Sequence, residues 1–234
     1  MPEAPLLVLW DIDHTLVAIT GVGRELYALA FERVTGQPLV HMADMAGRTE
    51  QAIIRETLAL NSVESAVAFE VFYAALVDAA RSLEARFRER GRVLPGARTA
   101  MAAFRAGGAV QSLVTGNLPS IAAAKLEAFG LEALVDFEVG GYGDDGSDRA
   151  VLVRLAVERS GAKYGHAFKA EHAVVIGDTP HDVRGALEAG AVAVGVATGA
   201  SDADALAAAG AHVVLPDLRD LAALHEVLLA RRAA

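Results

Sequence analysis

Short apolar runs alternate with amphipathic stretches along most of the chain. The apolar runs cover residues 6–10, 110–114, 135–139, 173–176, 192–196 and 212–215. The helical patterns that follow them cover residues 119–129, 149–160, 180–189, 202–209 and 218–231. Alternation of strands and helices of these lengths is typical of α/β proteins. The pattern therefore predicts a doubly wound parallel sheet of the α/β class.

The long interval between the first two apolar runs has a different pattern. Apolar residues recur there at helical spacing, without a convincing strand, through residues 25–34, 48–60 and 65–88. The interval ends at Leu94-Pro95-Gly96, which is a turn signal. We expect an all-helical cap domain over residues 17–94, inserted into a core domain formed by residues 1–16 and 95–234.

Composition narrows the class of protein. Apolar residues make up 53% of the chain and charged residues 22%, which is typical of a globular protein with a large core. The net charge of −9 argues against nucleic acid as a partner. No apolar segment approaches the ~20 residues of a membrane helix, so no membrane partner is expected. The absence of cysteine excludes disulfides and thiolate metal sites, and it fits a cytoplasmic protein.

The first apolar run ends abruptly in Asp11, Asp13 and Thr15. Residues two apart in a strand project to the same side, about 6–7 Å apart, so the two carboxylates face one space. Two like charges placed together need a positive partner, and a hard cation such as Mg²⁺ takes oxygen ligands. A strand-end aspartate can also be a nucleophile. The alternative, an Asx turn, explains one aspartate but not the pair.

Polar residues also follow two later apolar runs. Thr115, Gly116 and Asn117 follow one run, and Asp178 follows another. Ligands of open α/β sheets bind at the carboxyl ends of the strands, so these residues predict a Mg²⁺ site beside an anion cradle. Asn117 could instead serve only as a turn or cap residue before the next helix. Asp182 is read either as part of a helix capping box or as a supporting residue beside the metal.

Taken in order, these motifs resemble the haloacid dehalogenase superfamily, in the branch of phosphoglycolate phosphatases and β-phosphoglucomutases. The resemblance spans essentially the whole chain. It implies a Rossmann-like core with a helical cap, and a Mg²⁺-dependent phosphatase that acts on a small phosphate monoester. The matching residues are Asp11, Asp13 and Thr15 for the first signature, Thr115 for the second, and Gly177, Asp178 and Asp182 for the fourth.

The third signature of the superfamily, a lysine, has no orthodox match. Lys163 and Lys169 precede the run at residues 173–176, which puts them at the wrong edge of the sheet. Arg149 opens its helix at the correct edge, and we predict that it is the cation facing the phosphate. Lys125, about 9 Å along its helix, is the rival. The alternative for Arg149 is a salt bridge within the acidic loop that precedes it.

The resemblance also implies a mechanism. Asp11 attacks phosphorus and becomes an aspartyl-phosphate, while Asp13 protonates the leaving oxygen and later activates water. Mg²⁺ is held by Asp11, Asp178 and the main-chain carbonyl of Asp13. The phosphate oxygens are bound by Thr115 and by the groups near Gly116 and Asn117, together with the cation.

One segment of the cap also attracts attention. Gly47-Arg48-Thr49 resembles a cap loop that reaches into the site in related enzymes, and Arg48 could bind a second anionic group of the substrate. Alternatively, Thr49 caps the next helix and Arg48 is solvated. Two further functions stay open: a sugar phosphomutase, and a non-catalytic binding or regulatory protein on the same fold. Either a monomer or a homodimer fits the sequence.

Overall fold

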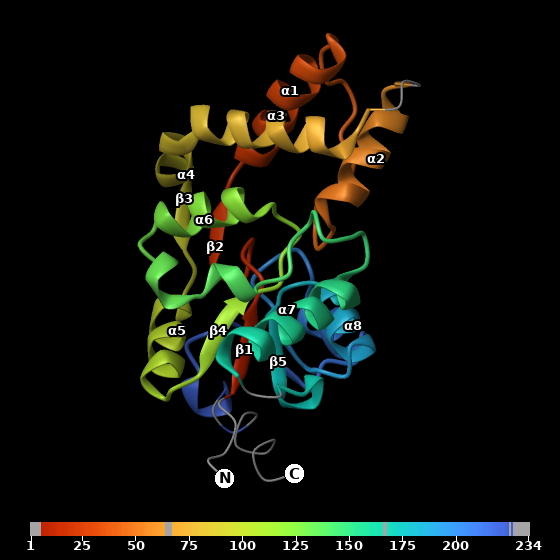
Figure 1. Cartoon of the computed structure of the whole chain (residues 1–234). Helices are drawn as coiled ribbons and strands as arrows, with labels where there is room; N and C mark the ends of the chain where they lie inside the picture. The colour runs from red at the N-terminus through yellow and green to blue at the C-terminus, as the bar shows by residue number, and fades with distance from the viewer. Residues whose placement is uncertain (1–5, 64–66, 166–167, 225, 227–234) are drawn as a thin grey trace.

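The computed structural model describes residues 6–63, 67–165, 168–224 and 226, and Figure 1 shows helices above a sheet. The described residues form a five-stranded sheet in the order β4-β1-β5-β6-β7. Every neighbouring pair in this sheet is parallel, which confirms the predicted α/β fold class. The strands are β1 (Leu7–Trp10), β4 (Val110–Leu113), β5 (Ala173–Gly177), β6 (Val192–Val196) and β7 (Val213–Leu215).

Strand β1 lies inside this sheet and is buried on both faces. Leu7 and Leu9 pack against α7 (Arg149–Tyr164) and α8 (Pro180–Glu188). Val8 and Trp10 point the other way, toward α5 (Ala97–Ala106). Successive strand side chains alternate between faces, so an uninterrupted apolar run is what a sheet covered on both sides requires.

The segment between β2 (Val17–Ile19) and β3 (Gly91–Val93) forms a separate helical layer, seen at the top of Figure 1. Large aromatic side chains, among them Tyr27, Phe31 and Phe72, form its own apolar core. Ile121 of α6 (Pro119–Glu127) closes this core from below, so the layer rests on a helix that follows β4. The helices of the layer are α1 (Val22–Thr35), α2 (Glu50–Leu60), α3 (Phe69–Ser82) and α4 (Glu84–Arg90). The domain boundaries drawn from the sequence stay a prediction.

The helical pattern through residues 65–88 is divided by a break. Helix α3 ends at Ser82, whose hydroxyl donates a hydrogen bond to the Ala79 carbonyl oxygen at 2.7 Å. Leu83 then leaves the helical conformation, with φ −108° and ψ 11°. A serine that bonds to the backbone in this way weakens the helix, because it competes with the regular hydrogen-bond ladder.

The expectation of no strand in the cap interval was wrong at its two ends. The short strands β2 (Val17–Ile19) and β3 (Gly91–Val93) pair antiparallel as a two-stranded ribbon. Leu94 and Thr20 extend the pairing through backbone hydrogen bonds to Leu16 and Arg90. Three residues are too few to give a period-two pattern, so only the tertiary pairing identifies these strands.

The strand predicted at residues 135–139 was also wrong. The chain forms 3₁₀ turns there, η1 (Glu132–Leu134) and η2 (Phe137–Val139). The Asp136 side chain accepts a hydrogen bond from the Glu138 N–H at 3.0 Å, which folds the backbone into a turn. An aspartate that bonds its own backbone two residues on favours a turn over an extended strand. The apolar side chains of this run still pack against the core.

Two short helices complete the described structure, η3 (Ala170–His172) and α9 (Ala203–Ala208). Within the helix predicted at residues 218–231, residues 221–224 are helical, whereas residue 225 and residues 227–231 lie outside the described residues. Among the described helices, none combines the length and the apolar character needed to cross a membrane.

Gly96 gives a stability test of the turn that returns the chain to the core. Its φ is +82°, and a Cβ atom there would lie 2.1 Å from the Leu218 carbonyl carbon. We expect Gly96→Ala to lower the free energy of unfolding by roughly 3 kcal/mol, because left-handed strain adds to overpacking. Urea unfolding measures this loss.

Gly108 is the matched control. Its φ is +77°, but a Cβ atom there would meet nothing within 4 Å. Gly108→Ala should therefore cost only the strain, about 1–2 kcal/mol. Equal losses in the two variants would contradict the close approach of Gly96 to Leu218.

Candidate active site

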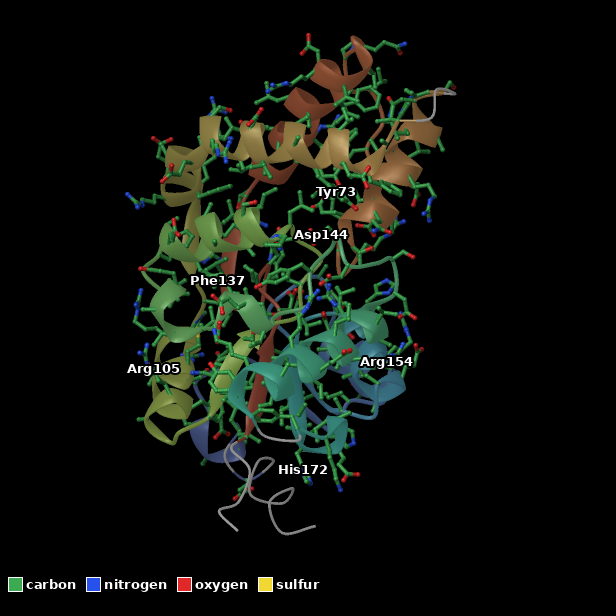
Figure 2. All side chains as sticks on the ribbon, in the orientation of Figure 1. Tyr73, Arg105, Phe137, Asp144, Arg154 and His172 are labelled. Atoms are coloured by element: carbon green, nitrogen blue, oxygen red, sulfur yellow. The ribbon has the colours of Figure 1, made fainter. Side chains whose placement is uncertain are left out.

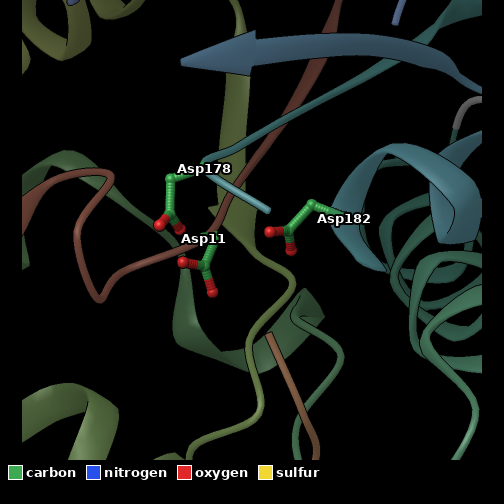
Figure 3. Close-up of side chains that lie close together, drawn as sticks. All are labelled: Asp11, Asp178 and Asp182. Carbon is green, nitrogen blue, oxygen red and sulfur yellow. The ribbon is translucent and has the colours of Figure 1, made fainter. Parts of the chain in front are cut away.

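Three strands deliver polar residues to one edge of the sheet. Asp11 follows β1, Thr115 lies just beyond β4, and Asp178 follows β5. Because β4, β1 and β5 are neighbours and parallel, their carboxyl ends meet there. Figure 3 shows the carboxylates of Asp11 and Asp178 close together, with Asp182 aimed toward them from the start of α8. One oxygen from each of these three carboxylates lies within 4.8 Å of the others.

The acid cluster is electrostatically strained. Burial, reinforced by the charge of Asp182, raises the pKa of Asp11 to about 7 despite the nearby Arg149. Burial and the charge of Asp11 raise the pKa of Asp178 to about 8. The Thr15 hydroxyl lies 3.4 Å from an oxygen of both Asp11 and Asp178. No described cationic side chain forms an ion pair with Asp178, so this side of the cluster lacks positive charge.

The donor set fits a hard divalent cation. Asp11 and Asp178 offer buried carboxylate oxygens and no nitrogen or sulfur, which suits Mg²⁺. The Asp13 carboxylate is engaged elsewhere, so only its main-chain carbonyl is left for such an ion. Asp182 is also engaged elsewhere, because its Oδ2 accepts hydrogen bonds from the Thr179 N–H at 3.1 Å and the Thr179 hydroxyl at 2.7 Å.

Arg149 lies within the cluster. One of its terminal nitrogens donates to Asp11 Oδ1 at 2.8 Å and also to Asp182 Oδ1. Its Nε and Nη1 atoms are buried and have no partner. The alternative of a salt bridge within the acidic loop was wrong, because Asp145 of that loop pairs with Arg159 at 2.6 Å instead. Arg149 thus has donors to spare beside the Asp11 carboxylate.

Asp182 forms the capping box predicted from the sequence, and its supporting role beside a metal stays a prediction. Its carboxylate and the Thr179 hydroxyl form a reciprocal capping box at the start of α8. The same carboxylate pairs with Arg149 inside the cluster. Asp182 therefore fixes the helix and orients the guanidinium.

Lys125 reaches back along α6 to the opposite side of the site. Its ammonium contacts both Asp13 oxygens, at 2.7 and 2.6 Å, and Asn117 Oδ1 at 2.7 Å. Although burial opposes the shift, Lys125 and Asn117 hold the pKa of Asp13 below its usual value. Lys125 thus pairs with Asp13, whereas Arg149 pairs with Asp11 and Asp182. Lys163 pairs with Asp136 and Glu138, away from the site, as expected.

The 115–117 loop faces the carboxylates. The Asn117 amide donates to Asp13 Oδ2 and to the Thr115 hydroxyl, both at 2.8 Å. Asn117 does not cap α6, because the N-cap residue is Leu118 and it makes no side-chain capping bond. Gly116 has no room for a side chain, since a Cβ atom there would lie 1.9 Å from the Arg48 carbonyl oxygen.

The cap contacts the core directly through residues 47–51. The Glu50 N–H donates to the Gly116 carbonyl oxygen at 3.1 Å, and Gln51 Nε2 donates to the Asp144 carbonyl oxygen at 3.0 Å. In Figure 2, Tyr73 of the cap lies just above Asp144 of the core at this junction. A cavity of about 420 Å³ lies between the helical layer and the sheet. Its lining includes the carboxylates of Asp11, Asp13 and Asp178 and the cationic side chains of Arg24, Arg48, Lys125 and Arg149.

Arg48 lines this cavity, but its side chain turns along the helix α2 that follows it. It pairs with Glu56 at 2.5 Å and donates to the Asp44 and Ala52 carbonyl oxygens. Thr49 occupies the N-cap position of α2 without capping it, and its buried hydroxyl has no partner. The alternative that Thr49 caps the helix and Arg48 is solvated was wrong. The binding of an anionic group by Arg48 stays a prediction.

Comparison with known proteins places the chain in a family. A family model described as haloacid dehalogenase-like hydrolase matches residues 8–187. The chain belongs to this family. The resemblance read from the sequence motifs is thereby confirmed, and with it the enzymatic class of hydrolase.

Relatives of this haloacid dehalogenase-like hydrolase extend over its whole length. The probable phosphatase IndB of Dickeya dadantii (strain 3937) is 28% identical over 233 residues, covering 95% of this chain and 94% of that protein. A hydrolase from Pseudomonas syringae is similar with a TM-score of 0.67 at 21% identity, covering 97% and 99% of the two chains. A proposed β-phosphoglucomutase from Bacteroides vulgatus has a TM-score of 0.67 at 18% identity, covering 99% and 92%. These two structures show the fold alone.

Sequence reasoning missed Glu50 and Tyr27 of this hydrolase. Glu50 is 6% exposed, lines the cavity, and accepts a hydrogen bond from the buried Tyr27 hydroxyl. An acidic side chain in the first turn of a helix normally interacts with the helix dipole while it stays exposed to solvent. The sequence position of Glu50 therefore gave no reason to expect burial. Its place directly after the 47–49 segment was the available signal.

The strained acid cluster predicts an unusual dependence of stability on pH. The folded-state pKa values of Asp11 and Asp178 are raised, so the folded protein binds more protons than the unfolded chain. This contribution to stability is present below pH about 4 and is lost as pH rises through about 7–8. We expect excess Mg²⁺ to raise the melting temperature of the metal-free hydrolase more at pH 8 than at pH 5, measured by calorimetry.

Asp178→Asn is the control for this effect. The substitution removes one of the repelling charges. The melting temperature of the variant should therefore decrease less from pH 5 to pH 8 than that of the wild type. The response to Mg²⁺ should also disappear. If Mg²⁺ does not change the melting temperature of the wild type at either pH, the cation site is contradicted.

Proposed function

We propose that this hydrolase is a Mg²⁺-dependent phosphatase that cleaves the phosphate monoester of a small metabolite through an aspartyl-phosphate on Asp11. One observation carries the proposal. The Asp11 carboxylate lies between the Arg149 guanidinium and the unneutralised Asp178 carboxylate, at the wall of the cavity. A nucleophile flanked by a fixed cation and a cation-binding carboxylate suits attack on a phosphate dianion.

The residues divide the chemistry between them. An Asp11 oxygen forms a bond to phosphorus while the bond from phosphorus to the ester oxygen breaks. Because Lys125 holds the pKa of Asp13 low in the free enzyme, Asp13 takes up a proton when the substrate binds and gives it to the departing alcohol. It recovers one from the water that hydrolyses the aspartyl-phosphate. Mg²⁺, held by Asp11, Asp178 and the Asp13 carbonyl, would reduce the repulsion between the nucleophile and the phosphate.

The two cations receive different roles in this proposal. Arg149 lines the cavity and lies beside the Asp11 carboxylate, which suits its guanidinium to phosphate oxygens. Lys125 is engaged with Asp13 and Asn117, so it orients the acid and base group instead. Thr115, Gly116 and Asn117 are proposed to bind the remaining phosphate oxygens from the 115–117 loop.

The acceptor of the phosphoryl group distinguishes a phosphatase from a phosphomutase. Both reactions use Asp11 and Asp13 in the same way and differ in whether water or a sugar hydroxyl attacks the intermediate. Phosphate release from a phosphomonoester panel that includes para-nitrophenyl phosphate tests for hydrolysis, and formation of a second sugar phosphate tests for transfer. The cytoplasmic location and the choice between monomer and homodimer stay predictions.

Asp11→Asn tests the nucleophile. An amide does not attack phosphorus, so we expect kcat to fall by roughly a thousandfold or more. The substitution keeps the shape of the side chain and relieves repulsion with Asp178, so the circular dichroism spectrum and melting temperature should stay close to those of the wild type. Residual activity near a tenth of the wild-type value would refute the assignment.

Arg149→Lys and Lys125→Met separate the two cations. Arg149→Lys keeps the charge but loses the spare donors, so we expect the inhibition constant of inorganic phosphate to rise by about tenfold. Lys125→Met should chiefly lower kcat, because Asp13 loses the partner that orients it and lowers its pKa. Steady-state kinetics with para-nitrophenyl phosphate measures both effects. The reverse pattern would exchange the two roles.

A further inference from the structure

Glu50 is a buried acid that the mechanism does not use. It begins α2, belongs to the cap, and lines the cavity together with Asp13 and Lys125 of the core. Its backbone N–H is tied to the Gly116 carbonyl oxygen, so its position is fixed relative to the 115–117 loop. The charges of Lys125 and Asp13 affect the pKa of Glu50, so Glu50 lies on the same side of the cavity as these two residues. Asp13 is proposed to protonate the leaving alcohol, so the alcohol part of an ester would lie on this side.

The carboxyl group of Glu50 has one oxygen satisfied and one open. The Tyr27 hydroxyl donates to Oε2. The other oxygen, Oε1, accepts no hydrogen bond from the described residues, and it is not among the enclosed atoms without a partner. Since Glu50 lines the cavity, Oε1 is accessible from it. An open acceptor in a largely buried group is costly unless a ligand supplies a donor.

No described cation neutralises Glu50. The neighbouring Arg48 pairs with Glu56, and the donors of Lys125 go to Asp13 and Asn117. Burial raises the pKa of Glu50 to about 7, even though the hydrogen bond from Tyr27 favours the charged form. An acidic side chain that only stabilised the helix N-terminus could interact with the helix dipole from an exposed position. It would then avoid the cost of burying a carboxylate.

We propose that Glu50 determines specificity by accepting a hydrogen bond from a hydroxyl group on the alcohol part of the substrate. The preferred substrates are then phosphate esters of polyols or sugars, and esters that place a carboxylate against Glu50 are disfavoured. This inference rests on the proposed phosphatase function and deepens it. The cavity of about 420 Å³ is large enough for such a small ester.

The test compares pairs of esters that differ only in hydroxyl groups. Glycerol phosphate is paired with propyl phosphate, erythritol phosphate with butyl phosphate, and ribitol phosphate with pentyl phosphate. The wild type should prefer the polyol ester in at least one pair by about tenfold or more in kcat/KM, because a site built for a hydroxyl rejects the analogue that lacks it. Phosphoglycolate and para-nitrophenyl phosphate complete the panel.

Glu50→Gln is the decisive variant because it keeps the shape of the side chain. The Tyr27 hydroxyl donates to the amide oxygen, so the amide NH₂ group faces the cavity and an acceptor becomes a donor. The polyol preference should fall by about fivefold or more, and phosphoglycolate should gain by a similar factor relative to para-nitrophenyl phosphate. Glu50→Ala should lose the polyol preference without a specific gain for phosphoglycolate.

Glu32→Gln is the matched control, since Glu32 lies exposed on α1 of the same cap. It should change neither ratio. If the wild type cleaves para-nitrophenyl phosphate but shows no polyol preference, or if Glu50→Gln leaves that preference intact, the specificity inference is overturned. If the wild type releases phosphate from no ester at all, the proposed function itself fails.

Discussion

The repulsion among buried carboxylates at the edge of the sheet is the constraint on which the site depends. Asp11, Asp178 and Asp182 share a space in which burial disfavours the charged forms of Asp11 and Asp178. Arg149 balances part of this charge by bridging Asp11 and Asp182. The remainder falls on Asp178, with which no described cation forms an ion pair. This repulsion is costly to the fold, and the Mg²⁺ site proposed above would relieve it.

The second constraint is the close approach of cap and core backbones. Gly116 lies against the Arg48 carbonyl, and a Cβ atom on Gly47 would lie 2.2 Å from the Thr179 hydroxyl oxygen. Side chains other than hydrogen at these glycines would hold the two layers apart. The Glu50 N–H bond to Gly116 then fixes the first turn of α2 above the site. These close contacts fix the backbone around the cavity, and the backbone in turn determines where the side chains that line the cavity lie.

Much of this arrangement could be predicted from the sequence because its signals are local or follow from topology. The uninterrupted apolar run of β1 predicted a strand covered on both faces, and parallel strand ends predicted the meeting of Asp11, Thr115 and Asp178. The ribbon of β2 and β3 could not be predicted, because it depends on pairing between distant three-residue segments. The turn at Asp136 overrode an apolar run through one side-chain hydrogen bond. The side-chain partners of Arg48 and Glu50 could not be predicted, because they depend on how the loop before α2 and the helices α1 and α2 pack within the helical layer.

The ribbon of β2 and β3 has a mechanical consequence. The two connections between the helical layer and the sheet are joined by hydrogen bonds from the Leu94 N–H to the Leu16 carbonyl oxygen and from the Thr20 N–H to the Arg90 carbonyl oxygen. They therefore form a single stalk instead of two independent tethers, and neither can bend without carrying the other. Any swing of the helices away from the sheet is restricted to motion about that stalk. If the helices swung away from the sheet about this stalk, Arg48 and Glu50 would move with them. The cavity would then open and lose both side chains from its lining in the same motion.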